Sequence, residues 1–159
     1  MAYAVVRTDN LTGTFDGSKL RSVLFHEADA AAAIENGNIV LLDSRMEATT
    51  QRDVWKAVAP AGEFVEGKIA LIASPEVMHD ERKKNLDEFR NEAGVNARAY
   101  VLEKGNEFAV TEEALEGVPA IGAEIGVGTG TKLALAAGLG VCTGIEVVGT
   151  KTFYVITVM

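Results

Sequence analysis

The sequence has few of the residues that build disulfides and metal sites. Among its 159 residues there is one cysteine, Cys142, and there are two histidines, His26 and His79. One cysteine cannot form an intrachain disulfide, and it supplies too few thiolates for a zinc site. We therefore expect neither a bound metal ion nor a cofactor.

Long apolar runs are also lacking. No run approaches the roughly 18 apolar residues that a membrane-spanning helix needs. The first residues, Met1 to Arg7, lack the basic stretch and the long apolar stretch of a secretory signal. The expectation is a protein without a membrane partner, made in the cytoplasm and kept there or built into a particle.

Positive charge is scarce. The chain has 15 Lys and Arg residues against 23 Asp and Glu residues, a net charge of -8, and the basic residues form no stripe. Binding to nucleic acid relies on clustered Lys and Arg facing the phosphates. We therefore expect no nucleic acid partner.

What the chain does have is short apolar runs separated by its 16 glycines. Such runs between turn residues are typical of strands, and many short strands in succession favour a barrel or a sandwich. The fold class predicted is β-rich α+β, with barrel and sandwich left open. The predicted strands cover 22–25, 39–42, 53–58, 68–73, 97–102, 108–110, 123–127, 132–136, 141–148 and 152–158.

One inserted surface helix is predicted over about 75–93. Ser74 can cap free N–H groups, Pro75 suits the first helical position, and Glu76 suits the positive end of the helix dipole. Gly94 stands where a helix commonly ends. The alanine-rich run 27–35 is expected to form a helical turn or two.

Residues 1–20 are predicted to be an extended N-terminal arm, followed by a single β-rich body over 21–159. The arm is polar and rich in turn residues, so it either wraps over the body or reaches a neighbour. We expect the body to fold without it. A soft boundary within the body is expected near 117–119, at Gly117-Val118-Pro119.

Candidates for chemistry each have a plainer interpretation. The run Gly126 to Lys132 lacks the order of a phosphate-binding loop and predicts a hairpin turn. Cys142 lies in an apolar strand without a nearby histidine, so core packing is favoured. His79 and His26 are expected at the surface, and Trp55 in the core. No catalytic residue is predicted, and the chain is not expected to be an enzyme.

Three stretches of the sequence carry a resemblance to known proteins: the opening Met1-Ala2-Tyr3-Ala4-Val5-Val6-Arg7-Thr8, residues 36–42, and residues 68–77 with 80–84. The first resembles the N-terminal arms, the second a turn-into-strand segment and the third a strand–helix unit of the small auxiliary proteins of tailed bacteriophages, which are encoded near the major capsid gene. The resemblance covers about a third of the chain.

The resemblance implies a capsid decoration or cement protein on the outside of the virion, assembled in the host cytoplasm. Its partner would be the major capsid protein, with a homo-oligomer as a further possibility. We expect the arm to supply the contacts, and the residues chosen for this role are Tyr3, Val5, Val6, Arg7 and Phe15.

Three other functions stay open at this point. The chain could be another virion part, such as a head fibre base or a connector component. It could be a β-barrel module that binds a small ligand or a peptide. It could also be a hydrolase built on Cys142 or His79, which a lowered thiol pKa or a closed cleft around His79 would favour.

Overall fold

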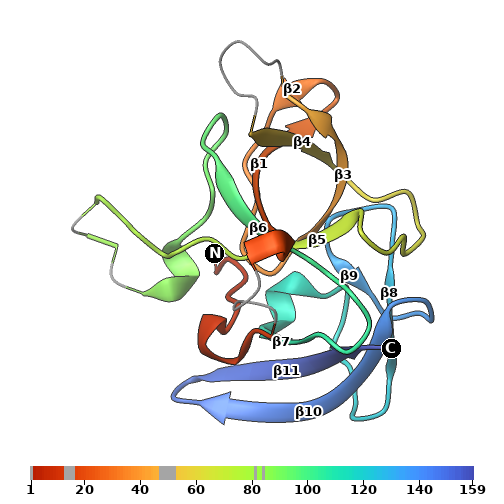
Figure 1. Ribbon diagram of the computed structural model, residues 1–159. Helices are drawn as coiled ribbons and strands as arrows, with labels where there is room; N and C mark the ends of the chain where they lie inside the picture. The colour runs from red at the N-terminus through yellow and green to blue at the C-terminus, as the bar shows by residue number, and fades with distance from the viewer. Residues whose placement is uncertain (1, 13–16, 47–52, 81, 84) are drawn as a thin grey trace.

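The computed structural model describes residues 2–12, 17–46, 53–80, 82–83 and 85–159. The described part of the chain is all-β, built from two curved sheets that lie one against the other (Figure 1). The strands are β1 Leu20–Glu27, β2 Ala30–Ala31, β3 Ile39–Arg45, β4 Val54–Val58, β5 Ile69–Ile72, β6 Ala97–Val101, β7 Glu107–Val110, β8 Glu124–Val127, β9 Leu133–Ala134, β10 Gly140–Val148 and β11 Lys151–Val158.

The first sheet is a closed five-stranded barrel. Its order is β1-β4-β3-β5-β6, and β6 returns to pair with β1, while the short β2 flanks β1. The β1–β4 pair is parallel and the other pairs are antiparallel. Of the two architectures that the sequence left open, the first sheet is therefore a barrel.

The second sheet is a curled half-barrel with the order β7-β11-β10-β8-β9. It packs on one side of the barrel, so β3 and β5 are covered on both faces. Ile39 and Leu71 belong to the core shared with the half-barrel, whereas Val40 and Ile72 belong to the core inside the barrel. Burial on both faces explains why these strands are continuous apolar runs rather than alternating ones.

The second half of the chain is rich in glycine, and at Gly140 the glycine has a steric reason. A Cβ placed at Gly140 would collide with the backbone carbonyl of Thr157 on β11. Only glycine allows the two strands to approach this closely. β10 also carries a bulge between Cys142 and Gly144, and bulges of this kind increase strand twist.

The predicted helix over 75–93 is wrong. The only helical turn that the structure describes there is a 3-10 turn, η3 Leu86–Glu88. Asp80 accepts hydrogen bonds from the backbone N–H and the guanidinium of Arg82, at 3.0 Å each, and such local side-chain bonds compete with helix formation. The apolar stripe was also narrow, and helices in proteins rely on an apolar face that packs. The fold is therefore all-β rather than α+β.

The helical turns predicted for 27–35 are absent as well. Ala28 and Asp29 have φ of 50° and 64°, and they reverse the chain between β1 and β2. A non-glycine residue in this region is uncommon, although aspartate tolerates it better than most. The described residues contain no helix long and apolar enough to span a membrane.

The described part of the N-terminal segment lies along the half-barrel. Val6 forms an antiparallel bridge with Val110 of β7, and Leu11 is buried in the shared core. Of the two arrangements that the sequence allowed, residues 2–12 therefore show the wrapped one. The chain crosses from barrel to half-barrel between β6 and β7, and Gly117-Val118-Pro119 lies within the half-barrel part.

Candidate functional site

Two of the predicted contact residues are buried in this chain's own structure. Val5 and Val6 are each 2% exposed. Tyr3 and Arg7 are half-buried, and Phe15 lies outside the described residues. Among the described residues of this set, therefore, only Tyr3 and Arg7 have exposed side-chain surface that a partner could contact in the free chain.

Both of these side chains already have neighbours in the chain. The guanidinium of Arg90 lies 5.4 Å from the ring centre of Tyr3, and that of Arg7 lies 5.8 Å from the ring centre of Phe153. Arg7 also forms an ion pair with Glu146. These contacts hold the N-terminal segment on the body.

Cys142 is placed for packing rather than reactivity. Its side chain is buried in the shared core, and its thiol donates a weak hydrogen bond to the carbonyl of Gly144, at 3.6 Å. Burial raises the pKa of the Cys142 thiol, with a smaller opposing effect from the bond to Gly144. A thiol with a raised pKa is a poor nucleophile near neutral pH.

The other motifs take their expected places. β8 and β9 pair across the run Gly126 to Lys132, which confirms the hairpin turn. His26 lies 3.0 Å from the carbonyl of Leu24 through its Nδ1, and His79 is exposed at the rim of a cleft. Within the described ranges, no group of three His, Cys, Asp or Glu side chains gathers in a way that could hold a metal ion.

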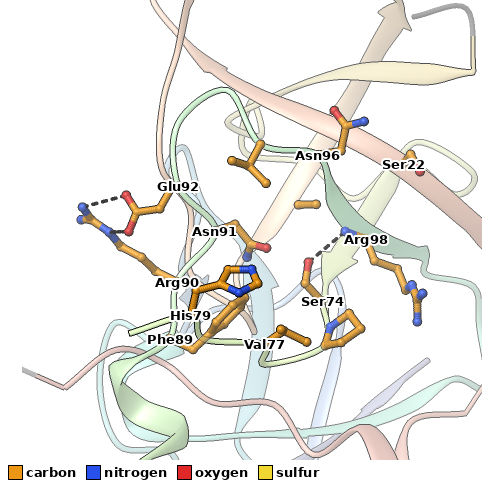
Figure 2. A pocket seen from close by; sticks show the side chains of 13 residues that line it. Ser22, Ser74, Val77, His79, Phe89, Arg90, Asn91, Glu92, Asn96 and Arg98 are labelled. Carbon is orange, nitrogen blue, oxygen red and sulfur yellow. Dashed lines mark hydrogen bonds and ion pairs between the residues drawn. The ribbon is translucent and has the colours of Figure 1, made fainter. Parts of the chain in front are cut away.

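That cleft lies beneath the excursion, the residues 75–96 that leave the barrel between β5 and β6. Figure 1 shows the described parts of the excursion projecting from the side of the barrel, and Figure 2 shows the cleft. Its volume is about 470 Å³. Val77, Phe89 and Val95 give it an apolar lining, Ser22 of β1 and Arg98 of β6 line its barrel side, and Asn96 lines it from the end of the excursion.

A buried amide network fixes the cleft to the barrel. The Nδ2 of Asn91 donates to the carbonyl of Ile34 and to the Oδ1 of Asn36, at 3.1 Å each. Asn36 in turn donates to the carbonyl of Ser74, at 2.9 Å. Ser74 accepts a hydrogen bond from the backbone N–H of Arg98 at 2.9 Å (Figure 2). Both ends of the excursion are thus tied to the barrel.

An arginine-rich groove adjoins the cleft. The groove has a volume of about 620 Å³. It is lined by side chains from four barrel strands: Arg21 of β1, Arg45 of β3, Trp55 of β4 and Arg98 of β6. The Arg45 guanidinium lies 5.5 Å from the ring centre of Trp55. Arg21 donates to the carbonyls of Ser18 and Leu20. Trp55 is therefore half-buried beside the barrel core, with an arginine against its ring.

The cleft and the groove share Ser22 and Arg98, and we call the two together the side recess. The guanidinium of Arg98 makes no ion pair or hydrogen bond with any residue that the structure describes. In Figure 2 it lies on the opposite side of the cleft from the Arg90–Glu92 pair. It is therefore available to a partner.

No family model, curated protein or solved structure matches this chain.

The charge of the side recess contrasts with the rest of the molecule. Three of the chain's seven arginines line the groove, on a protein with a net charge of -8. Asp53 is the one carboxylate among the described residues of its lining. Arginine forks pair well with carboxylates. The recess can therefore take an apolar group in the cleft and an acidic group in the groove.

Sequence reasoning missed these arginines because they are far apart in the chain. Arg21, Arg45 and Arg98 stand on three strands whose neighbours are set by the order of the barrel. In the barrel, Ser22 pairs with Arg98 and Arg45 pairs with Trp55. The one signal in the sequence is that Arg98 lies in the predicted strand 97–102 and Arg21 directly before the predicted strand 22–25, whereas Arg45 lies three residues past the predicted strand 39–42. This does not bring the three together.

Proposed function

We propose that the protein is a non-enzymatic structural component of a phage head, which binds the outside of the major capsid shell and stabilises it. The observation that supports this proposal best is the side recess, with an apolar half and an arginine half that meet at Ser22 and Arg98. The resemblance of residues 1–8, 36–42 and 68–77 with 80–84 to phage auxiliary proteins points to the phage head as the place of binding.

The recess suits a protein surface that offers acidic and apolar side chains close together. An apolar side chain of the shell would enter the cleft beside Val77 and Phe89. Carboxylates beside it would pair with Arg98 and Arg45. Because the chain is acidic elsewhere, an acidic partner is repelled from other orientations, so the recess sets the direction of docking.

Attachment of this kind stabilises a shell by repetition. Each copy needs only a moderate affinity, because many copies bind the same particle and each bridges neighbouring subunits. The tied ends of the excursion keep the cleft formed before binding, which lowers the entropy that docking must overcome.

The first test is to count copies of this polypeptide in particles purified from its source, by quantitative mass spectrometry. Hundreds of copies in a simple ratio to the major shell protein support the proposal. A few copies favour a head fibre base or a connector part instead. Absence from the particle overturns the proposal.

The second test asks whether the recess is the contact. Particles lacking the protein are incubated with purified wild-type chain or with Arg98→Glu, and bound protein is measured after sedimentation. Arg98→Glu is expected to reduce binding at least about tenfold, since breaking a charge-assisted pair costs about 1.5–3 kcal/mol. Lys104→Glu makes the same change of charge beyond the far end of β6 and is expected to bind normally.

A second candidate function is a module that binds a small ligand or a peptide. The cleft supports it, because 470 Å³ falls within the roughly 300–1,000 Å³ of ligand sites. A rise in melting temperature with an acidic, apolar peptide or a small carboxylate, in a protein that is absent from particles, favours this function over the first.

A further inference from the structure

The half-barrel has one long edge that the chain covers itself. Residues 5–12 run beside β7, where the backbone N–H of Arg7 donates to Ala109 at 2.9 Å and that of Thr12 donates to Glu107 at 3.0 Å. Thr111 donates to the carbonyl of Val5 at 3.0 Å. The backbone groups of β7 on this side are therefore paired within the chain.

The edge of β10 is different. β8 pairs only with Gly140 and Val141, and the N–H of Gly122 reaches the carbonyl of Cys142. Beyond this point, no strand among the described residues pairs with the outer side of 143–148, which we call the β10 edge. Figure 1 shows the β10–β11 hairpin running along the outside of the molecule.

Half of the backbone groups in such a segment face away from β11, because alternate residues of an antiparallel strand turn to opposite sides. The side chains do not protect this edge. Val147 is 71% exposed and Ile145 42% exposed, and Val148 is exposed too. Natural edge strands are commonly blocked by lysine, proline or inward charge. The β10 edge contains no lysine and no proline.

Its single charge is part of a cluster of ion pairs within the chain. Glu146 is the only charged residue of the β10 edge, and its carboxylate lies 2.5 Å from the guanidinium of Arg7. Arg7 also pairs with Asp9, at 2.7 Å, so the cluster of Asp9, Arg7 and Glu146 carries a net charge of -1. The rest of the β10 edge is uncharged, and Glu146 itself has a partner.

We propose that the β10 edge pairs antiparallel with the same edge of a second copy, forming a two-fold symmetric dimer. A two-fold axis near Glu146 places Ile145 of each copy beside Val147 of the other. Such apolar cross-strand pairs stabilise antiparallel sheets. Glu146 of one copy lies opposite Glu146 of the other, and each keeps the ion pair with its own Arg7, which reduces the repulsion between the two carboxylates. The two half-barrels then form one continuous sheet.

The identity of the occupant follows from this symmetry. An isologous contact needs a surface that is complementary to itself, and an open strand edge with alternating apolar side chains meets that need. The net charge of -8 on each copy opposes association at long range. Salt screens this repulsion while leaving strand pairing in place, so the dimer is expected to tighten as salt is added.

The test is sedimentation equilibrium of the full chain from roughly 10 µM to 1 mM, a range suited to weak association. We expect a reversible monomer–dimer equilibrium whose dissociation constant falls between low and high salt. Val147→Lys and Ile145→Lys are expected to weaken it at least about tenfold. Arg7→Gln leaves two bare Glu146 carboxylates across the axis, so it is expected to weaken the dimer most strongly at low salt.

Val77→Lys is the matched control, since Val77 is also an exposed valine but lies on the excursion. It should leave the dimer unchanged. A wild-type chain that stays monomeric over the whole range overturns the inference. So does a dimer that both edge lysine variants leave intact. The inference is independent of the proposed function, because Val77→Lys and Arg98→Glu probe the side recess, whereas Val147→Lys probes only the β10 edge.

Discussion

The guanidinium of Arg7 lies 2.5 Å from a carboxylate oxygen of Glu146, 139 residues later in the chain. This ion pair links the N-terminal segment to the β10–β11 hairpin. The hydrogen bond from Arg7 to Asp9 is the main reason why the pKa of Arg7 is raised, with Glu146 adding to it. The ion pair therefore holds the N-terminal segment against the β10–β11 hairpin.

Deleting residues 1–12 is expected to destroy the folded state rather than to spare it. Four side chains of this segment, Ala4, Val5, Val6 and Leu11, are buried. Burying a large apolar side chain contributes about 1.5–3 kcal/mol, and a typical domain has a net stability of only about 5–15 kcal/mol. The cooperative transition in a circular dichroism melt should therefore be lost or shifted far down.

Thr8→Ala is the control for this truncation, since Thr8 is exposed in the same segment. It should melt like the wild type. A truncated chain that keeps the wild-type transition would show that the segment only lies on the surface, in agreement with the sequence-based prediction that the body folds without the arm.

Replacing Asn91 tests the amide network beneath the excursion. Asn91→Leu keeps the volume but removes the donor to Ile34 and Asn36. Leaving buried acceptors unpaired costs about 1–3 kcal/mol. We expect lower stability in urea and faster hydrogen exchange over 85–96. Asn96→Ala, at an exposed position on the same excursion, should change neither. Unchanged exchange in Asn91→Leu would mean that other contacts hold the excursion.

The strands could be predicted because their signals are local. The runs around Ile39 and Ile69 are buried on both faces, so their successive residues are all apolar and can be recognised as strands from the sequence. The runs at 97–102 and 152–158 were found in the same way. Turns such as Asn36-Gly37, where Gly37 has φ of 84°, are equally local.

The excursion and the side recess could not be predicted for two different physical reasons. Capping residues at 74–76 start a helix only if an apolar face then packs, and the residues after Met78 bond locally instead, as Asp80 does with Arg82. The arginine groove depends on the parallel pairing of β1 with β4 and on the return of β6 to β1. Neither strand pairing can be predicted from the residues that surround Arg21 or Arg98 in the sequence.

Cys142 is expected to be chemically silent in the folded protein. Burial raises the pKa of its thiol, so the reactive thiolate is scarce at neutral pH. A thiol reagent such as DTNB should modify the native chain far more slowly than the urea-unfolded chain. The variant Val147→Lys keeps the core and should protect Cys142 equally. Rapid modification of the native chain would reopen the interpretation of Cys142 as a nucleophile.

The Arg90–Glu92 pair at the rim of the cleft gives a pH signature. The hydrogen bond from the Arg90 side chain is the largest cause that lowers the pKa of Glu92, and the charges of Arg90 and Lys83 add to it. A carboxyl whose pKa is lowered on folding stabilises the fold above its ordinary pKa. The contribution is lost as the pH falls through the lowered pKa. The rim pairing should therefore persist at neutral pH and disappear only in acid.

Carbon-13 detected titration of the Glu92 carboxyl measures this directly. Its midpoint is expected to lie below the ordinary glutamate value of about 4.3. Arg90→Gln removes both the hydrogen bond and the nearer charge, so it should raise the midpoint toward that value. Lys83→Gln removes only a distant charge and should raise it less. Equal shifts in the two variants would show that the general positive charge around the excursion, rather than the Arg90 hydrogen bond, sets the titration of Glu92.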